Sequence, residues 1–364
     1  MKILLLSAYD AASHRVWREG LVRHLDDVHW TVLTLPPRNF AWRSRGNALT
    51  WALDRRAELT ESYDLLLATS MTDLAEIRGL VPEMARLPTI VYFHENQFAY
   101  PERLERREGQ NYQLTNIFTA LAADRVVFNS EYNRSSMVEG ARQLLRTMPD
   151  CVPDGIVESI RDKSMVLPVP LDDDCFGGHA GENNGLPLTL VWNHRWEHDK
   201  APERFFRAIY ELSDRGCDFV IHVLGQRFRD WPPVFDEARK VLGGHVGRWG
   251  YVQEKEEYRD VLRSSDVVIS TSLHDFQGLA VLEGAAAGCF PLVPDRLAYR
   301  EIFPDSCRYP SYPEDPEAER TAVVDLLVEM CSDPGAIRGR AVPDIGHLSW
   351  KKMKNRYRDL IRSL

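Results

Sequence analysis

The chain alternates short apolar runs with amphipathic stretches over most of its 364 residues, and this rhythm constrains the fold more than any other feature. Short apolar runs are typical of strands that are buried on both faces, and amphipathic stretches between them are typical of crossover helices. The alternation therefore predicts parallel sheets covered by helices, which makes this an α/β chain. The expected strands are residues 2–8, 30–35, 64–69, 89–94, 125–129 and 164–169, followed later by 188–192, 218–224, 246–252 and 266–271.

A polar segment interrupts the alternation about half-way along the chain. Residues 172–186 are rich in Gly, Asn and Asp and show no periodicity, which is typical of a linker. We therefore predict an N-terminal domain over residues 1–171 and a C-terminal domain over 187–346. A basic helix within 347–364 is expected to pack back towards the N-terminal domain. The predicted architecture is two doubly wound, Rossmann-like domains that face a cleft.

Composition limits the class of protein. The formal net charge of −9 argues against a general nucleic-acid binder, although a local basic face is compatible with it. The six cysteines are scattered without the spacing of a zinc site, as in a reduced cytoplasmic protein. The first apolar run is too short for a signal peptide, and no run approaches the roughly 18 apolar residues of a membrane span. We expect a cytoplasmic protein that does not bind a membrane.

Residues 266–291 contain the clearest sign of a binding site. They predict a strand, a tight loop and a helix that opens near Gly278, with Asp275 and Glu283 eight residues apart. The first N–H groups of a helix are unpaired and lie at the positive end of its dipole, which suits a phosphate. The carboxylates suit sugar hydroxyls, so the segment favours a nucleotide-sugar. The alternative is an ordinary strand, loop and helix with two surface acids.

A second loop presents two cations. Pro202 favours the first turn of a helix, so Arg195 and Lys200 fall in the loop between that helix and the preceding strand. An arginine fork and a lysine point charge would offset the two charges of a diphosphate. The alternative is a charged loop with internal salt bridges to Glu197 and Asp199.

Strings in both halves resemble one known family. In the C-terminal half these are WNHRWEHDKAPERFF, HVLGQRF, WGYV, SDVVIST, HDFQGLAVLEG and GCFPLVPDRLAYREIFP. In the N-terminal half they are SHRVWREGL, LTLPPRNFAWRSRGNALTWA, YFHENQFAYP and VVFNSEYN. The chain resembles the tRNA-queuosine α-mannosyltransferases, which are retaining, family 4-like glycosyltransferases with the GT-B fold. The resemblance implies transfer of mannose from GDP-mannose to queuosine in a tRNA anticodon, without a cofactor or a metal ion.

The resemblance also implies roles for particular residues. Arg195 and Lys200 would hold the donor diphosphate, Asp275 the donor sugar and Glu283 the ribose hydroxyls. Retaining glycosyltransferases with the GT-B fold usually have Glu where this chain has Asp275. The residues predicted to act in catalysis are His94, Arg195, Lys200, Asp275 and Glu283. The donor-binding set adds Gly225, Tyr251, Val252, Gln277, Gly278 and Leu279. We expect a front-face attack in which the leaving phosphate takes the proton of the acceptor.

Acceptor contacts are predicted in the N-terminal half. The strand at 89–94 runs into a polar loop that begins at His94, and by resemblance His94 lies beside the donor sugar. A histidine fixed only by its neighbours is the alternative. The acceptor contacts predicted in this loop and in the first loop of the chain are Ser13, His14, Glu95, Asn96 and Gln97.

Residues 38–56 interleave arginines with aromatic residues. Cations beside aromatic rings contact phosphates and stack on unpaired bases, which is the usual way to recognise an RNA loop. The predicted contacts are Arg38, Trp42, Arg43 and Arg45. The alternative is a helix whose tryptophans are core and whose arginines are solvated. A second cluster, Arg103, Arg106 and Arg107, is weaker because acids alternate with its arginines.

Two other functions stay open on the sequence alone. One is a retaining glycosyltransferase with a different donor sugar or with a lipid or polysaccharide acceptor. The other is a module that binds a nucleotide-sugar or RNA without turnover. The presence of Arg195, Lys200 and Glu283 together favours an enzyme, with a nucleotide-sugar and a queuosine-containing tRNA as its expected partners.

Overall fold

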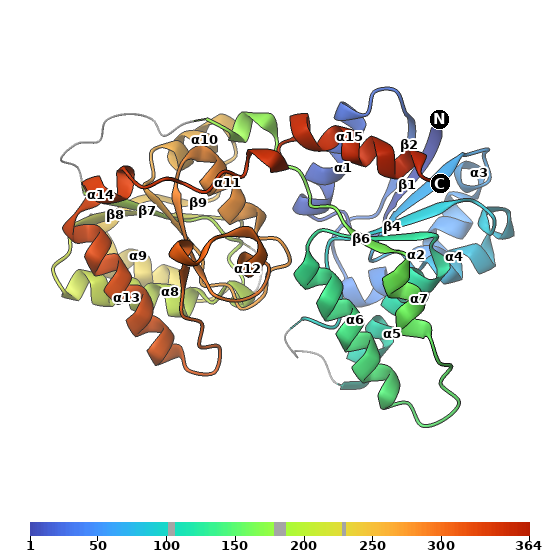
Figure 1. Cartoon of the computed structure of the whole chain (residues 1–364), viewed down its shortest axis with the longest axis horizontal. Helices are drawn as coiled ribbons and strands as arrows, with labels where there is room; N and C mark the ends of the chain where they lie inside the picture. Colours follow the sequence, from blue (N-terminus) through green and yellow to red (C-terminus); the bar gives the residue numbers. More distant parts are fainter. Residues whose placement is uncertain (101–105, 178–186, 228–230) are drawn as a thin grey trace. The chain divides into compact units, whose positions relative to one another are not determined.

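A computed structural model describes residues 1–100, 106–177, 187–227 and 231–364 of the chain (Figure 1). These residues form two compact units. Unit 1 contains Met1–Pro170 and Trp350–Leu364, and unit 2 contains Leu171–Ser349. Of the predicted linker, residues 178–186 lie outside the described residues, and 172–177 belong to unit 2.

Unit 1 is built on a six-stranded sheet whose paired strands all run parallel. The strand order is β2-β1-β3-β4-β5-β6, so the order reverses beside β1, as in a doubly wound sheet. All residues of β3 and β4 are buried, as expected for strands covered on both faces. The strands are β1 (Lys2–Ser7), β2 (His29–Thr34), β3 (Leu65–Thr69), β4 (Thr89–Phe93), β5 (Arg125–Phe128) and β6 (Ser164–Val166).

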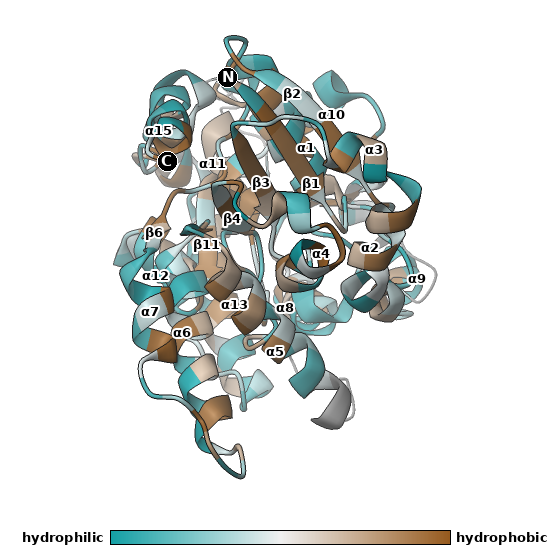
Figure 2. Cartoon of the chain, turned by 90° about the vertical axis from the view of Figure 1, so that its right-hand side faces the viewer, coloured by the Kyte–Doolittle hydropathy of each residue, from teal (hydrophilic) through white to brown (hydrophobic). Residues whose placement is uncertain are grey.

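The helices of unit 1 begin at conventional capping residues in two places. Asp73 accepts a hydrogen bond from the N–H of Glu76 at the start of α4, and Ser130 does the same for Asn133 at the start of α6. Figure 2 shows β1 and β3 as apolar strands, whereas the helices carry hydrophilic residues as well. The helices are α1 (Ala12–His24), α2 (Phe40–Asp54), α3 (Arg56–Leu59), α4 (Leu74–Leu80), α5 (Arg106–Ala122), α6 (Glu131–Arg146), α7 (Ile156–Asp162) and α15 (Trp350–Arg362).

The last helix, α15, belongs to unit 1 and lies beside α1 (Figure 1). The indole of Trp350 packs so closely on Gly20 that a Cβ there would have no room, and it stacks on His24 at a ring distance of 4.9 Å. Tyr357 accepts a hydrogen bond from Trp17 Nε1 at 3.1 Å. The basic face of α15 therefore stays outside while its aromatic residues complete the core of unit 1.

Unit 2 repeats the doubly wound pattern with strand order β12-β11-β10-β7-β8-β9, again with parallel pairs. Its order reverses between β7 and β10. The strands are β7 (Leu188–Trp192), β8 (Phe219–Leu224), β9 (Val246–Gly250), β10 (Val267–Ile269), β11 (Phe290–Pro294) and β12 (Arg308–Tyr309). The helices are α8 (Pro202–Asp214), α9 (Val234–Leu242), α10 (Lys255–Arg263), α11 (Leu279–Ala287), α12 (Tyr299–Ile302), α13 (Pro316–Ser332) and α14 (Pro334–Arg338).

Aromatic side chains fill the core of unit 2. Trp192 lies 5.6 Å from Phe205 and 5.6 Å from Phe235, measured between ring centroids, and Trp196 stacks on Phe235 at 4.1 Å. The predicted α/β fold with two doubly wound domains is confirmed. None of the helices in the described part of the chain has the length and apolarity that a membrane crossing requires.

Candidate functional site

Two loops of unit 2 begin where its sheet order reverses. One follows β7 and ends where α8 starts at Pro202, and the other follows β10 and ends at Gly278, the N-cap of α11. In open parallel sheets, ligands bind at the carboxyl ends of the strands beside such a reversal. Both loops that the sequence singled out therefore lie at the expected binding edge of this sheet.

Hydrogen bonds join the two loops. The N–H groups of residues 273–274 donate to the carbonyl oxygen of Asp199 at 2.9 and 3.3 Å. The Thr271 hydroxyl donates to the carbonyl oxygens of Lys200 and Ala201 at 2.9 and 3.2 Å. Because each loop supplies donors or acceptors to the other, a shift in one loop must move the other.

Lys200 lies buried between these loops. Its Nζ donates to the carbonyl oxygen of His274 at 2.6 Å and lies 3.4 Å from Asp199 Oδ2 and 3.5 Å from Asp275 Oδ2. Burial acts to raise the pKa of Asp275, but the charge of Lys200, helped by His194, more than offsets it and leaves the pKa below its ordinary value. Asp275 is therefore an ionised carboxylate held beside a buried ammonium group.

Asp275 uses both of its oxygens inside the protein. Oδ1 accepts from the N–H of Gly278 at 3.0 Å, and Oδ2 accepts from the hydroxyl of Tyr299 at 3.1 Å. Gly278 has φ +73°, and a Cβ there would lie 2.6 Å from the Tyr299 ring, so only glycine fits. The N–H of Gly278 is thus committed to Asp275. The N–H groups of α11 that suit a phosphate are those of its first turn, starting at Leu279, which have no acceptor inside the helix.

Glu283 lies on α11 and accepts a hydrogen bond from the Tyr258 hydroxyl at 2.7 Å. The amide of Asn193 donates to that same hydroxyl at 2.9 Å and to the carbonyl oxygen of Ala280 at 2.8 Å. Burial raises the pKa of Glu283, and the hydrogen bond from Tyr258 opposes this rise. A carboxylate has about four acceptor sites, so capacity for ligand hydroxyls is left after the bond from Tyr258.

Arg195 and Gly225 lie at the edge of the same site. Arg195 is about half exposed and forms an ion pair with Glu197 at 2.9 Å, so an internal salt bridge, the alternative interpretation of this loop, does form. Gly225 has φ +151°, and a Cβ there would clash with the carbonyl oxygen of His194. Gly225 is therefore required for the close approach of the loops that follow β7 and β8.

The other predicted donor contacts differ in exposure. Tyr251 is 64% exposed just after β9, where its ring is available to a ligand. Val252 and Gln277 are buried. Val252 belongs to the hydrophobic core of the unit, so its side chain supports the site from behind.

In unit 1, His94 follows β4 and is surrounded by aromatic rings. The rings of His14, Trp17 and Tyr92 surround it at centroid distances of 4.2, 4.8 and 4.7 Å. Burial lowers the pKa of His94 well below its ordinary value, and His14 lowers it further, so the imidazole is neutral at pH 7. Within the described part of the chain, Nε2 of His94 has no hydrogen-bond partner.

His14 and Glu95 form a pair beside His94. Nε2 of His14 lies 2.9 Å from Oε2 of Glu95, and Oε1 of Glu95 accepts from the Ser70 hydroxyl at 3.2 Å. Ser13 is exposed at the start of α1. The structure thus places His14, on α1, against His94 and Glu95, which follow β4, and leaves Ser13 at the surface.

Asn96 was predicted to contact the acceptor, but its side chain does not face outward. Its side chain is fully buried, its amide donates to the backbone and side chain of Asn133 at 3.0 and 2.8 Å, and its Oδ1 accepts from the N–H of Phe98 at 2.9 Å. Asn96 therefore shapes the loop instead of offering a contact to an acceptor. Gln97 is partly buried, and its backbone N–H donates to Asn116 at 2.8 Å.

The two tryptophans of α2 have opposite placements. Trp51 is 1% exposed and belongs to the core, whereas Trp42 is 52% exposed. The indole of Trp42 packs against Gly46, where a Cβ would come within 2.7 Å of the ring. Trp51 is therefore a core residue, which was the alternative interpretation of this helix, whereas the ring of Trp42 is exposed to solvent.

The arginines predicted to bind RNA surround Trp42 in the sequence. Arg38 is exposed, Arg43 is partly buried, and Arg45 pairs with Asp73 at 3.0 Å and with Thr115 at 2.9 Å. Arg103 of the weaker cluster, with the side chains of Arg106 and Arg107, lies outside the described residues.

Comparisons with known proteins decide the family. The tRNA-queuosine alpha-mannosyltransferase N-terminal family model matches residues 2–171, and the group 1 glycosyl transferase model matches residues 187–329. A tRNA-queuosine alpha-mannosyltransferase of Drosophila melanogaster is 35% identical over 315 residues, which cover 84% of this chain and 83% of that protein. The chain belongs to the tRNA-queuosine α-mannosyltransferase family. The predicted resemblance is confirmed, and the protein is a glycosyltransferase.

Solved structures confirm the GT-B fold. Anabaena HepE, determined in complex with UDP and glucose, superposes with a TM-score of 0.72 at 13% identity, with 100% of both chains covered. Sucrose-phosphate synthase from Thermosynechococcus elongatus superposes with a TM-score of 0.70, also at 13% identity and with 100% of both chains covered. At this identity the likeness establishes the fold alone.

Proposed function

We propose that this family member transfers mannose, with retention, from GDP-mannose to queuosine in a tRNA anticodon. The main support for binding of a nucleotide-sugar donor is the buried ion pair of Lys200 and Asp275 near the start of α11. Family membership and the activity named for the Drosophila relative support the choice of sugar and acceptor. A tRNA acceptor makes this a cytoplasmic reaction, and the family resemblance requires no cofactor or metal ion.

Lys200 and the first turn of α11 would bind the donor diphosphate, with Arg195 at the edge. The Nζ of Lys200 has three N–H donors, of which one is used by the carbonyl oxygen of His274 at 2.6 Å. Its distances of 3.4 and 3.5 Å to the two aspartates are those of ion pairs, so its remaining donors can turn to a phosphate. Cations and helix N–H groups that are already in place stabilise charge without reorganisation during the reaction.

The reaction then needs no protein nucleophile. The bond between the anomeric carbon and the phosphate oxygen breaks, the electron pair leaves with GDP, and an acceptor hydroxyl oxygen forms the new bond on the same face. The acceptor proton passes to the leaving phosphate oxygen. Ionised Asp275 would accept hydrogen bonds from hydroxyls of the donor sugar, and Glu283 would accept them from the ribose hydroxyls. In unit 1, neutral His94 would offer Nε2 to a ligand hydroxyl.

The exposed face of Trp42 would stack on an unpaired base of the anticodon loop. Stacking on an aromatic ring together with arginine contacts to phosphates is the usual recognition of single-stranded RNA. The indole packs against Gly46, which has no side chain to displace it, and Arg38, Arg43 and Arg45 supply positive charge in the same stretch. Unit 1 would thus bind the tRNA.

The test is incubation of the full chain with GDP-mannose and a queuosine-containing tRNA, followed by mass spectrometry of the nucleosides. A hexose on queuosine is expected with GDP-mannose, and no product with UDP-galactose or with the same tRNA lacking queuosine. EDTA should leave the rate unchanged. Hexose transfer from another nucleotide-sugar alone would contradict the donor, and a product on RNA without queuosine would contradict the acceptor.

A further inference from the structure

A short segment after β11 forms hydrogen bonds with the loop that carries Asp275. Arg296 and Tyr299 lie three residues apart in this segment, and Leu297 between them has φ +58°. A left-handed conformation is costly for a leucine, and such strain persists only where surrounding contacts enforce it. The contacts of Arg296 and Tyr299 are therefore the first place to look for its cause.

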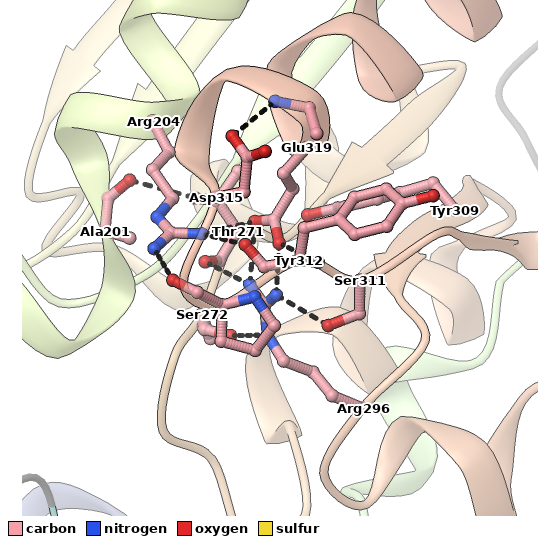
Figure 3. A network of polar contacts seen from close by, with 12 residues as sticks. Ala201, Arg204, Thr271, Ser272, Arg296, Tyr309, Ser311, Tyr312, Asp315 and Glu319 are labelled. Carbon is pink, nitrogen blue, oxygen red and sulfur yellow. Dashed lines mark hydrogen bonds and ion pairs between the residues drawn. The ribbon is translucent and has the colours of Figure 1, made fainter.

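Arg296 holds the beginning of the loop. Its Nε donates to the carbonyl oxygen of Ser272 at 2.8 Å, and its Nη2 donates to that of Thr271 at 3.0 Å (Figure 3). The guanidinium is held in turn by both carboxylate oxygens of Glu319, a side chain that is 2% exposed. Arg204 lies 3.2 Å from the same carboxylate. Glu319 therefore pairs with both arginines, and its two-point contact with Arg296 fixes the position of that guanidinium.

Tyr299 holds the other end of the loop. Its hydroxyl lies 2.9 Å from Ser270 Oγ and 3.1 Å from Asp275 Oδ2. Because an ionised carboxylate only accepts, the Tyr299 hydroxyl donates its proton to Asp275. With Gly278 N–H on Oδ1, the plane of the Asp275 carboxylate is set by two donors. The remaining acceptor sites of the carboxylate then point in fixed directions.

We propose that Arg296 and Tyr299 act as a clamp that sets the position of Asp275, and that Tyr299 is a positioning residue for the donor sugar. Retaining glycosyltransferases with the GT-B fold usually have Glu at this position. An aspartate is one methylene shorter, so its carboxylate depends more on the residues that hydrogen-bond to it. This proposal rests on the proposed role of Asp275 in holding the sugar. It assigns to Tyr299 the orientation of that carboxylate and to Arg296 the course of the backbone that leads to it.

The test compares Tyr299→Phe with Tyr309→Phe in the full chain. Tyr309 is a matched control because it is also buried and donates to the carbonyl oxygen of Ser270 at 2.8 Å, without reaching Asp275. Tyr299→Phe keeps the ring on Gly278 and removes one hydrogen bond to a charged group, so kcat/KM for GDP-mannose should fall about 10- to 100-fold. Binding of GDP, which lacks the sugar, should change less than about twofold.

Tyr309→Phe should lower the Tm but leave the ratio of GDP-mannose to GDP affinity unchanged. Equal losses for GDP and GDP-mannose in Tyr299→Phe, or the same loss in both variants, would overturn the proposal. A ligand-free readout separates this outcome from failure of the proposed function. The carboxyl ¹³C titration of Asp275 should move to higher pH in Tyr299→Phe and stay in place in Tyr309→Phe, even if the wild type does not bind GDP-mannose. An unmoved titration would contradict the clamp itself.

Discussion

The candidate sites of the two units satisfy their polar groups in opposite ways. In unit 2, both oxygens of Asp275 accept hydrogen bonds and Lys200 is surrounded by acceptors. In unit 1, His94 packs against rings, and its Nε2 has no partner among the described residues. One site is a network of charges, and the other surrounds a neutral imidazole with aromatic rings.

This difference indicates how each site can recognise a ligand. Charges that are paired and fixed before binding stabilise the negative charge that grows on a leaving phosphate. A neutral imidazole costs less to bury than an ion, and an unpartnered ring nitrogen keeps one hydrogen bond for a ligand. Substitutions in unit 2 should therefore disturb a network, whereas substitutions in unit 1 should remove single contacts.

The largest effect is expected for Lys200→Ala. The variant removes the cation between Asp199 and Asp275, so transfer should fall on the order of 100-fold or more. The two carboxylates would also lose their shared partner, which should destabilise unit 2 by about 3 kcal/mol. Steady-state kinetics and urea unfolding measure both effects. Exposed Lys240 on α9 offers the control Lys240→Ala, and equal activity in the two variants would contradict the network.

A pH effect of similar size is expected from His194. Burial, followed by the charge of Lys200, lowers its pKa from 6.5 to about 4. Between these values the unfolded chain binds a proton that the folded chain does not, so stability is full above pH 6.5 and falls as the pH drops towards 4. The loss should reach about 3 kcal/mol.

His194→Gln should flatten this pH dependence, as measured by urea unfolding midpoints at pH 7 and pH 5. The exposed His198 provides the control His198→Gln, which should keep the wild-type slope. An unchanged slope in His194→Gln would mean that other groups cause the loss of stability in acid.

A smaller effect is expected for Glu283→Gln. The amide accepts hydrogen bonds from Tyr258 and from ligand hydroxyls less strongly than a carboxylate does. The affinity for GDP should therefore fall about 10-fold. Isothermal titration with GDP measures this change. Tyr258→Phe should produce part of the loss, because it removes the 2.7 Å hydrogen bond that orients Glu283. Unchanged GDP affinity in both variants would remove Glu283 from the nucleotide site.

The smallest effect concerns single contacts in unit 1. Trp42→Ala should weaken binding of queuosine-containing tRNA about 5- to 10-fold through loss of base stacking. Gly46→Ala should weaken it too, because its Cβ displaces the indole, although alanine favours the helix by about 1 kcal/mol. Leu49→Ala, at another exposed apolar residue of α2, is the control. Equal tRNA affinity in all three variants would show that Trp42 does not contact RNA.

Much of the fold was predictable because buried parallel strands leave continuous apolar runs in the sequence. Lys200 and Asp275 were predictable because their loops follow such strands directly. Tyr299 and Arg296 were not, since their contacts with the loop after β10 arise only when β10 and β11 pair in the sheet. Both residues lie in the string GCFPLVPDRLAYREIFP, but a string does not show which of its side chains contact that loop.

The placement of side chains within a segment was only partly predictable. Trp42 and Trp51 are nine residues apart, and about 100° per residue places them on opposite faces of a helix. Periodicity therefore predicts that one is exposed, but the packing of the unit decides which. The sequence predicts a ligand contact at Asn96 because this residue follows a buried strand. Its hydrogen bonds to Asn133 instead depend on α6, since Asn133 lies 37 residues later in the chain.

Hydrogen–deuterium exchange of the full chain tests most directly the central claim that unit 2 binds the donor and unit 1 binds the tRNA. The exchange is followed with GDP-mannose alone and with queuosine-containing tRNA alone. GDP-mannose should slow exchange in residues 193–200 and 270–283, and tRNA should slow it in residues 38–54. Protection of 38–54 by GDP-mannose, or protection by tRNA confined to unit 2, would contradict the account.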